Sequence, residues 1–115
     1  VIIAGSRSLH VTPKEIEEII KRSGFDIETV VFGDAPGIDA CVDKWVKSQM
    51  LMKWDGPYVA NWDHGRRAGP VRNGEMVKNA DALIAIWTGH SSPGTRNIIL
   101  QAQSKGLKTF VWVKD

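Results

Sequence analysis

Residues 29–39 read TVVFGDAPGID, and this stretch decides the fold that the sequence predicts. Its first four residues form a short apolar run of the kind that makes a buried parallel strand. A glycine-containing turn follows directly over 33–37, and from Gly37 onward apolar residues recur at helical spacing. A strand, a tight turn and a helix in this order form the first part of a βαβ unit, whose strands lie parallel in one sheet.

The same alternation extends in both directions from this stretch. We expect the other strands at residues 1–4, 57–60, 82–87 and 109–113. Helical patterns separate these strands and begin near Pro13, Gly37, Gly69 and Thr95, whereas 61–67 is expected to be an exposed loop. The first helix has the clearest limits: Thr12, Pro13 and Glu15 form an N-cap with a capping box, and Gly24 stands at the C-cap.

The second helix is expected to place Ile38, Cys41, Val42, Trp45, Val46 and Gln49 or Met50 on one face, with Asp43 and Lys47 paired on the other. The 115 residues therefore predict one domain with a Rossmann-like three-layer α/β fold. Its mostly parallel five-stranded sheet would be covered by helices on both faces.

The composition limits the classes of function. A net charge of +2 suits an anionic ligand but lacks the dense basic stripe of a duplex-DNA binder. The single cysteine excludes an internal disulfide and fits a reducing cytoplasm; we expect it to be a small core residue. The three histidines have no zinc spacing, and no apolar run approaches the ~18 residues of a membrane span. We expect a cytoplasmic protein with no signal peptide in these residues, no metal and no cofactor.

Three glycine-bearing turns carry the functional prediction. Because the carboxyl ends of parallel strands meet at one edge of a sheet, these turns should converge on one crevice. Glycine lets a backbone approach a ligand closely, and a helix N-terminus offers free N–H groups to an anion. The expected ligand residues are Gly5, Ser6 and Arg7 in the first turn, Gly33, Asp34, Gly37, Ile38 and Asp39 in the second, and Ser92, Gly94 and Thr95 in the third. The alternative is that the turns are tight connections, with Asp39, Ser92 or Thr95 serving only the helix N-termini.

Two further groups of polar residues are candidates for binding. Arg72 and Asn73 are expected in the first turn of the third helix, where an arginine fork and an amide could bind phosphate and ribose. A solvated arginine is the alternative. A basic cluster of His64, Arg66 and Arg67 lies beside Trp62, and such a loop either stacks on nucleotides or is simply a surface loop.

The joint order of these motifs resembles the SLOG superfamily, and most closely its small YspA-like branch from phages and bacteria. The matching residues are Gly5-Ser6-Arg7, 33–39, 68–73, 80–85 and 92–95. The resemblance implies a Rossmann-like domain that binds nucleotides or nucleotide-derived ligands, often as a dimer.

Two related families imply competing functions. The DNA-processing protein A (Smf) family shares a Gly-x-x-x-Gly-Ile-Asp turn, here 33–39, and an Arg-Asn pair, here Arg72-Asn73, and binds single-stranded DNA. The "lonely guy" phosphoribohydrolases share a Pro-Gly-x-x-Gly-Thr turn followed by glutamates. Here that turn is shortened to 93–95, and Arg96-Asn97-Ile98 stands where the glutamates would be, so the acid/base carboxylate of that family is missing.

The leading hypothesis is a domain that binds a nucleoside phosphate or an ADP-ribose-like ligand, as a homo-oligomer and most simply a dimer. Phosphates would rest on 33–37 and 94–95, with Arg7 and Arg72 as cationic clamps. Two alternatives remain. One is a nucleotide N-glycosidase that uses Asp34, Asp39 or Glu75 as its carboxylate. The other is single-stranded nucleic-acid binding through Trp62, Arg66 and Arg67.

Overall fold

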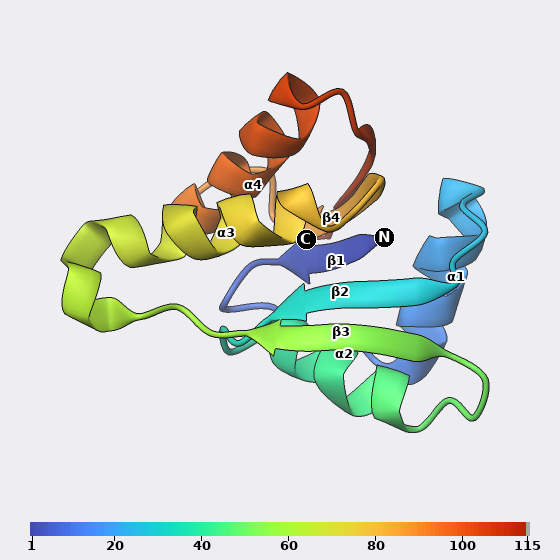
Figure 1. Cartoon of the computed structure of the whole chain (residues 1–115). Coiled ribbons are helices and arrows are strands. Elements are labelled where there is room, and N and C mark those ends of the chain that lie inside the picture. Colours follow the sequence, from blue (N-terminus) through green and yellow to red (C-terminus); the bar gives the residue numbers. More distant parts are fainter. Residues whose placement is uncertain (115) are drawn as a thin grey trace.

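Five parallel strands form a single sheet in the computed structural model, which describes residues 1–114. The strands are β1 (Ile2–Gly5), β2 (Thr29–Gly33), β3 (Lys53–Tyr58), β4 (Ala82–Trp87) and β5 (Lys108–Val113). Their order across the sheet is β3-β2-β1-β4-β5, and each neighbouring pair is parallel (Figure 1). The predicted α/β fold is confirmed, and the sheet is entirely rather than mostly parallel.

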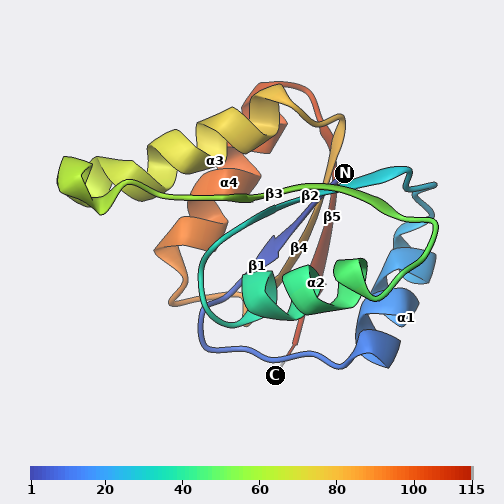
Figure 2. The ribbon, with the colours of Figure 1, turned by 60° about the horizontal axis from the view of Figure 1, so that its bottom comes forward.

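Helices cover both faces of the sheet. They are α1 (Pro13–Ser23), α2 (Ile38–Lys47), α3 (Ala68–Lys78) and α4 (Pro93–Ser104), with a 3₁₀ helix, η1 (Trp62–Arg67), leading into α3. Figure 2 shows α1 and α2 on one face and α3 and α4 on the other. None of the helices within residues 1–114 is long and apolar enough to cross a bilayer.

The alternation of side chains along β1 divides the core into two layers. Ile3 packs against Ile38 and Val42 of α2 on one face of the sheet. Ile2 and Ala4 belong to the core layer under α3 and α4 on the other face. Successive side chains of a strand point to opposite faces, so a fully buried strand needs apolar residues at every position. This requirement explains the unbroken apolar runs of β1, β2 and β4.

The limits predicted for α1 are confirmed in detail. The Thr12 hydroxyl accepts a hydrogen bond from the Glu15 N–H at 3.1 Å, and the Glu15 carboxylate accepts one from the Thr12 N–H at 3.1 Å. Gly24 ends the helix in the left-handed conformation, with φ 73°. In α2, the predicted Asp43–Lys47 pair is present at 2.7 Å.

Two predicted element limits are wrong. The third strand covers Lys53–Tyr58 instead of 57–60, because an edge strand with one exposed side needs no apolar alternation. Helix α2 ends at Lys47, where the Ser48 hydroxyl bonds the Trp45 carbonyl oxygen at 2.6 Å. Met50 therefore lies beyond the helix and is 99% exposed, not part of its buried face.

The segment before α3 is also more regular than predicted. Residues 61–67 are exposed as expected, but Trp62–Arg67 form η1, whose first turn is capped by the Asn61 side chain at 3.2 Å from the Asp63 N–H. Since α3 starts at Ala68, Arg72 and Asn73 lie in its second turn and not in its first. They are therefore removed from the free N–H groups of the helix N-terminus.

Candidate functional site

Buried polar side chains gather at the carboxyl edge of the sheet. Four polar or charged residues are buried within residues 1–114: Ser6 (1% exposed), Asp39 (4%), Asn73 (3%) and Thr95 (5%). Each lies on a segment that follows a different strand, after β1, β2, β3 and β4 respectively. All four are predicted site residues, so the sequence motifs and the burial of polar groups identify the same region.

The first and third turns meet directly. The Ser6 and Ser92 hydroxyls are 2.7 Å apart, and the Ser6 N–H donates to the Ile86 carbonyl oxygen at 3.0 Å. Ser92 occupies the N-cap position of α4, but its side chain makes no capping hydrogen bond. The alternative that Ser92 caps α4 through its hydroxyl is therefore wrong, because the hydroxyl pairs with that of Ser6, which follows β1.

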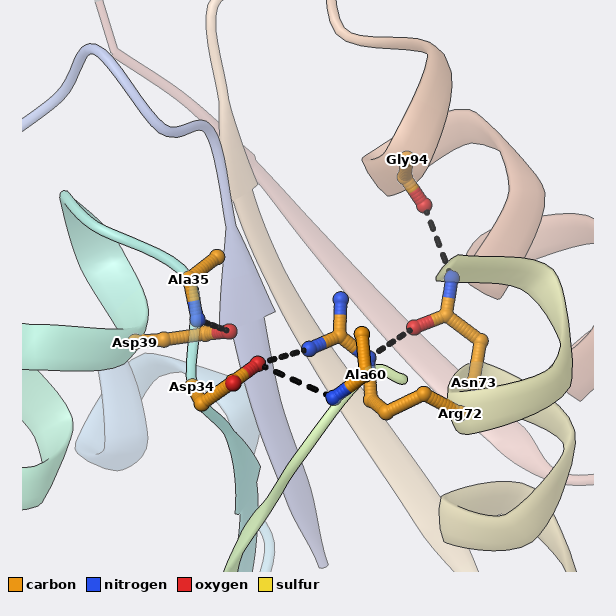
Figure 3. A network of polar contacts seen from close by, with 7 residues as sticks. All are labelled: Asp34, Ala35, Asp39, Ala60, Arg72, Asn73 and Gly94. Atoms are coloured by element: carbon orange, nitrogen blue, oxygen red, sulfur yellow. Dashed lines mark hydrogen bonds and ion pairs between the residues drawn. The ribbon is translucent and has the colours of Figure 1, made fainter. Parts of the chain in front are cut away.

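A polar network connects the second turn to α3 and α4 (Figure 3). Arg72 Nη1 donates to Asp34 Oδ1 at 2.8 Å, and Arg72 Nε donates to Asn73 Oδ1 at 3.0 Å. Asn73 Nδ2 in turn donates to the Gly94 carbonyl oxygen at 3.2 Å. The same Asp34 oxygen also accepts the Ala60 N–H at 3.5 Å. Arg72 is thus a positioned side chain and not a solvated one, and its third nitrogen, Nη2, makes no hydrogen bond within residues 1–114.

Two residues of α4 complete this network and were not predicted as site residues. Asn97 Oδ1 accepts hydrogen bonds from Asn73 Nδ2 at 3.1 Å and from Gln101 Nε2 at 2.8 Å. Gln101 Nε2 also donates to the Pro70 carbonyl oxygen at 3.0 Å. The only sequence signal was their spacing of four residues, which places two amides on one face of a helix.

The predicted site glycines differ in what stands beside them. A Cβ on Gly5 would collide with the Ile86 carbonyl oxygen and Ile38, and one on Gly37, at φ 77°, with the backbone of Ser6 and Arg7. A Cβ on Gly33 would lie 2.8 Å from both Arg72 Nη1 and Asp39 Oδ2. These three glycines therefore allow the chain to pack closely on itself.

Gly94 is the open position among them. A Cβ there would meet nothing within 4 Å, so the space in front of it is free. No side chain caps the N-terminus of α4, and the hydroxyl of Thr95, a residue that is 5% exposed, makes no hydrogen bond within residues 1–114. Uncapped N–H groups, an unbonded hydroxyl and free space together form an arrangement that suits an anion.

Asp39 is the buried charge of the site. Its Oδ2 accepts the Ala35 N–H at 3.1 Å, whereas Oδ1 makes no hydrogen bond within the described chain. Burial raises the pKa of this carboxyl to about 6, against the lowering effects of the Ala35 hydrogen bond and of the Arg72 and Arg7 charges. Asp39 therefore exchanges its proton near neutral pH.

The remaining predicted residues lie at the margin or in the core. Ile38 is fully buried, and it reaches the site only through its N–H, which donates to the Ser6 carbonyl oxygen at 3.2 Å. Arg7 is exposed, and its guanidinium carbon lies 5.5 Å from the centre of the Trp62 ring. Residues 64, 66 and 67 are exposed on η1, and Arg96 is exposed on α4.

Other features of the surface do not contribute to this region. Cys41 is half-buried and packs against the core, as predicted. No cluster of three metal-binding side chains occurs within residues 1–114. Hollows of about 320 and 480 Å³ lie elsewhere, one between α1 and Trp112 and the other beside residues 26–28 and 49–52.

No protein-family model matches the chain. The chain is similar to the gene 61 protein of Mycobacterium phage D29, with 38% identity over 86 residues. The similar region covers 68% of this chain and 66% of the phage protein, so the chain spans just under two thirds of that protein's length. The name of the phage protein is a gene number and states no activity. The similarity therefore agrees with a phage relationship and leaves the function to be argued from the site.

Proposed function

We propose that the chain binds a small nucleotide-derived ligand, such as a nucleoside phosphate or an ADP-ribose-like compound, at the carboxyl edge of the sheet. The observation that carries this proposal is the gathering of all four buried polar side chains of residues 1–114 at this edge. Burying polar groups costs stability unless they are fully hydrogen-bonded. Asp39 Oδ1 and the Thr95 hydroxyl make no hydrogen bond within residues 1–114, and neither is among the fully buried atoms that lack a partner, so both are accessible to a ligand.

The phosphate is assigned to the third turn. At Gly94 and Thr95 the helix N-terminus is uncapped and the space in front is free. The second turn is a poorer phosphate site, because the protein's own atoms fill the space beside Gly33 and Gly37. Its two carboxylates, Asp34 and Asp39, would also repel a phosphate. Carboxylates accept hydrogen bonds from hydroxyl groups, so this turn is better suited to a ribose.

Arg72 would bridge the two parts of the ligand. Its bonds to Asp34 and Asn73 fix the guanidinium plane, and the unpaired Nη2 is the donor left for a phosphate or ribose oxygen. Arg72 therefore acts as a clamp that is held in place before the ligand arrives, which lowers the entropy cost of binding.

The direct test is calorimetry with AMP, ADP and ADP-ribose on the wild type and on Gly94→Val. The branched valine side chain should fill the space before α4 and abolish ligand binding. The double variant that also carries Arg72→Ala should likewise fail to bind. Ser104→Val is the matched control, because it puts the same side chain on the exposed far end of α4. Unchanged affinity in Gly94→Val would show that this site assignment is wrong.

A second function is favoured by the buried carboxyl of Asp39, whose Oδ1 makes no hydrogen bond within residues 1–114 and whose pKa is raised by burial to about 6. A carboxyl that exchanges its proton near neutral pH can activate water for hydrolysis of an N-glycosidic bond. Release of free adenine from AMP, lost in Asp39→Asn, would support this nucleotide hydrolase. The rate should rise as pH increases through about 6, because the ionised form is the base. If adenine is not released at any pH, the protein is a binding domain alone.

A further inference from the structure

We propose that Trp62 and Arg7 form a stacking platform for the base of the bound nucleotide. This inference rests on the proposed function, since it adds a base subsite to the same ligand. It predicts that the protein distinguishes a nucleotide with its base from the corresponding sugar phosphate.

Trp62 is exposed but held in position. It is 55% exposed, and η1 buries none of its residues, so the indole contributes little to the core. The Asn61 cap fixes the start of η1, and the indole lies beside Gly69 at the start of α3. The Arg7 guanidinium stands over the ring at 5.5 Å. An exposed tryptophan fixed in this way offers a flat apolar surface at low entropy cost.

Arg7 links this surface to the rest of the site. Its neighbour Ser6 joins the third turn, and the backbone of both residues packs tightly on Gly37. The Arg7 charge also lowers the pKa of Asp39 against the effect of burial, so the guanidinium acts on the buried carboxyl as well as on the indole. Arg7 therefore connects the aromatic surface to the third turn through Ser6 and to the buried carboxyl through its charge.

The position of η1 in the fold supports the same conclusion. Figure 1 shows that η1, in yellow-green ahead of α3, projects past the ends of β1, β2 and β3 at which the site lies. A mononucleotide needs one aromatic surface, and this platform offers one tryptophan, whereas non-specific single-strand binding uses several bases along a basic groove.

The test compares AMP with ribose 5-phosphate by calorimetry on the wild type, Trp62→Ala and Trp62→Phe. Base stacking on an aromatic residue predicts that Trp62→Ala weakens AMP binding about 5- to 150-fold. Trp62→Phe should keep most of the affinity, and ribose 5-phosphate should bind all three proteins equally. The control is Trp54→Ala: this tryptophan is also exposed (45%), but it pairs with Val30 near the amino end of the sheet.

The outcomes separate the platform from the proposed function. If AMP binding is lost in Gly94→Val but unchanged in Trp62→Ala, the platform is wrong and the nucleotide site stands. Equal losses for AMP and ribose 5-phosphate in Trp62→Ala would also overturn the platform, because they would reflect a general distortion. If the wild type binds neither compound, both proposals fail. Affinity for oligothymidylate that grows with chain length would overturn the platform in favour of single-strand binding.

Discussion

Replacing Asp39 by asparagine should stabilise the protein at neutral pH. Asp39 is 4% exposed, and burial raises the pKa of its carboxyl from 3.8 to about 6. The folded protein thus holds this proton to a higher pH than the unfolded chain does. Stability therefore falls as the pH rises from about 4 to about 6, and the loss is complete above pH 6. With 1.36 kcal/mol for each unit of pH, the cost above pH 6 is about 3 kcal/mol.

Asparagine removes the charge and keeps the shape of the side chain. Its carbonyl oxygen can still accept the Ala35 N–H, which Asp39 Oδ2 accepts at 3.1 Å. Asp39→Asn should therefore raise the free energy of unfolding by up to about 3 kcal/mol at pH 7.5, or roughly 10 °C in Tm. At pH 4 the gain should be below about 1 kcal/mol, because Asp39 is then protonated in the folded protein.

Urea denaturation followed by circular dichroism at pH 4 and 7.5 measures both values. Comparing the variant with the wild type at each pH cancels the contribution of every other titrating group. Asp26→Asn is the control, since Asp26 is an exposed carboxylate outside the site and should respond little at either pH. The reasoning is refuted if Asp39→Asn gives the same change at both pH values, or if it destabilises the protein at pH 7.5.

Two substitutions test the packing and the polar network, and one measurement tests the proposed ligand and the oligomeric state. Gly37→Ala should destabilise the protein by several kcal/mol more than Gly24→Ala in thermal melts. Both glycines have positive φ, but only a Cβ on Gly37 meets backbone atoms. Asn73→Ala should lower the free energy of unfolding by about 2–4 kcal/mol in urea titrations. Without the amide, Arg72 Nε loses its acceptor and the Gly94 carbonyl oxygen loses its donor. Native mass spectrometry of freshly purified protein should show a dimer carrying a nucleotide, and a ligand-free monomer would contradict both expectations.

The sequence predicted the parts of the fold that local chemistry specifies. The run 82–87 is buried on both faces, so each position must be apolar, and the reciprocal bonds of Thr12 and Glu15 involve residues only three apart. β3 was placed incorrectly because its position at the edge of the sheet relaxes the need for an apolar pattern. The start of α3 was predicted to within one residue, but η1 was not predicted, because its exposed polar residues resemble a loop.

The candidate site was predicted by location more than by mechanism. The sequence indicated that the turns after β1, β2 and β4 converge, and the contact between Ser6 and Ser92 confirms that the first and third do. It did not distinguish a glycine that faces a ligand from one that faces the protein. Arg72, 39 positions after Gly33, fills the space beside that glycine, and the pairing of Arg7 with Trp62 spans an even longer stretch of sequence.

The buried polar residues divide into two groups by what they bond. Asn73 has its partners inside the protein, and the Ser6 hydroxyl has Ser92, so both hold the segments of the site together. Asp39 and Thr95 each keep an oxygen without a partner within residues 1–114, and Asp39 does so at a cost of about 3 kcal/mol above pH 6. A purely structural role does not explain why a carboxylate is retained there, because asparagine would make the same bond to Ala35. The stability lost at Asp39 is explained if the ionised carboxylate contacts a ligand, and an Asp39→Asn variant that is more stable yet no longer binds AMP would establish this exchange of stability for function.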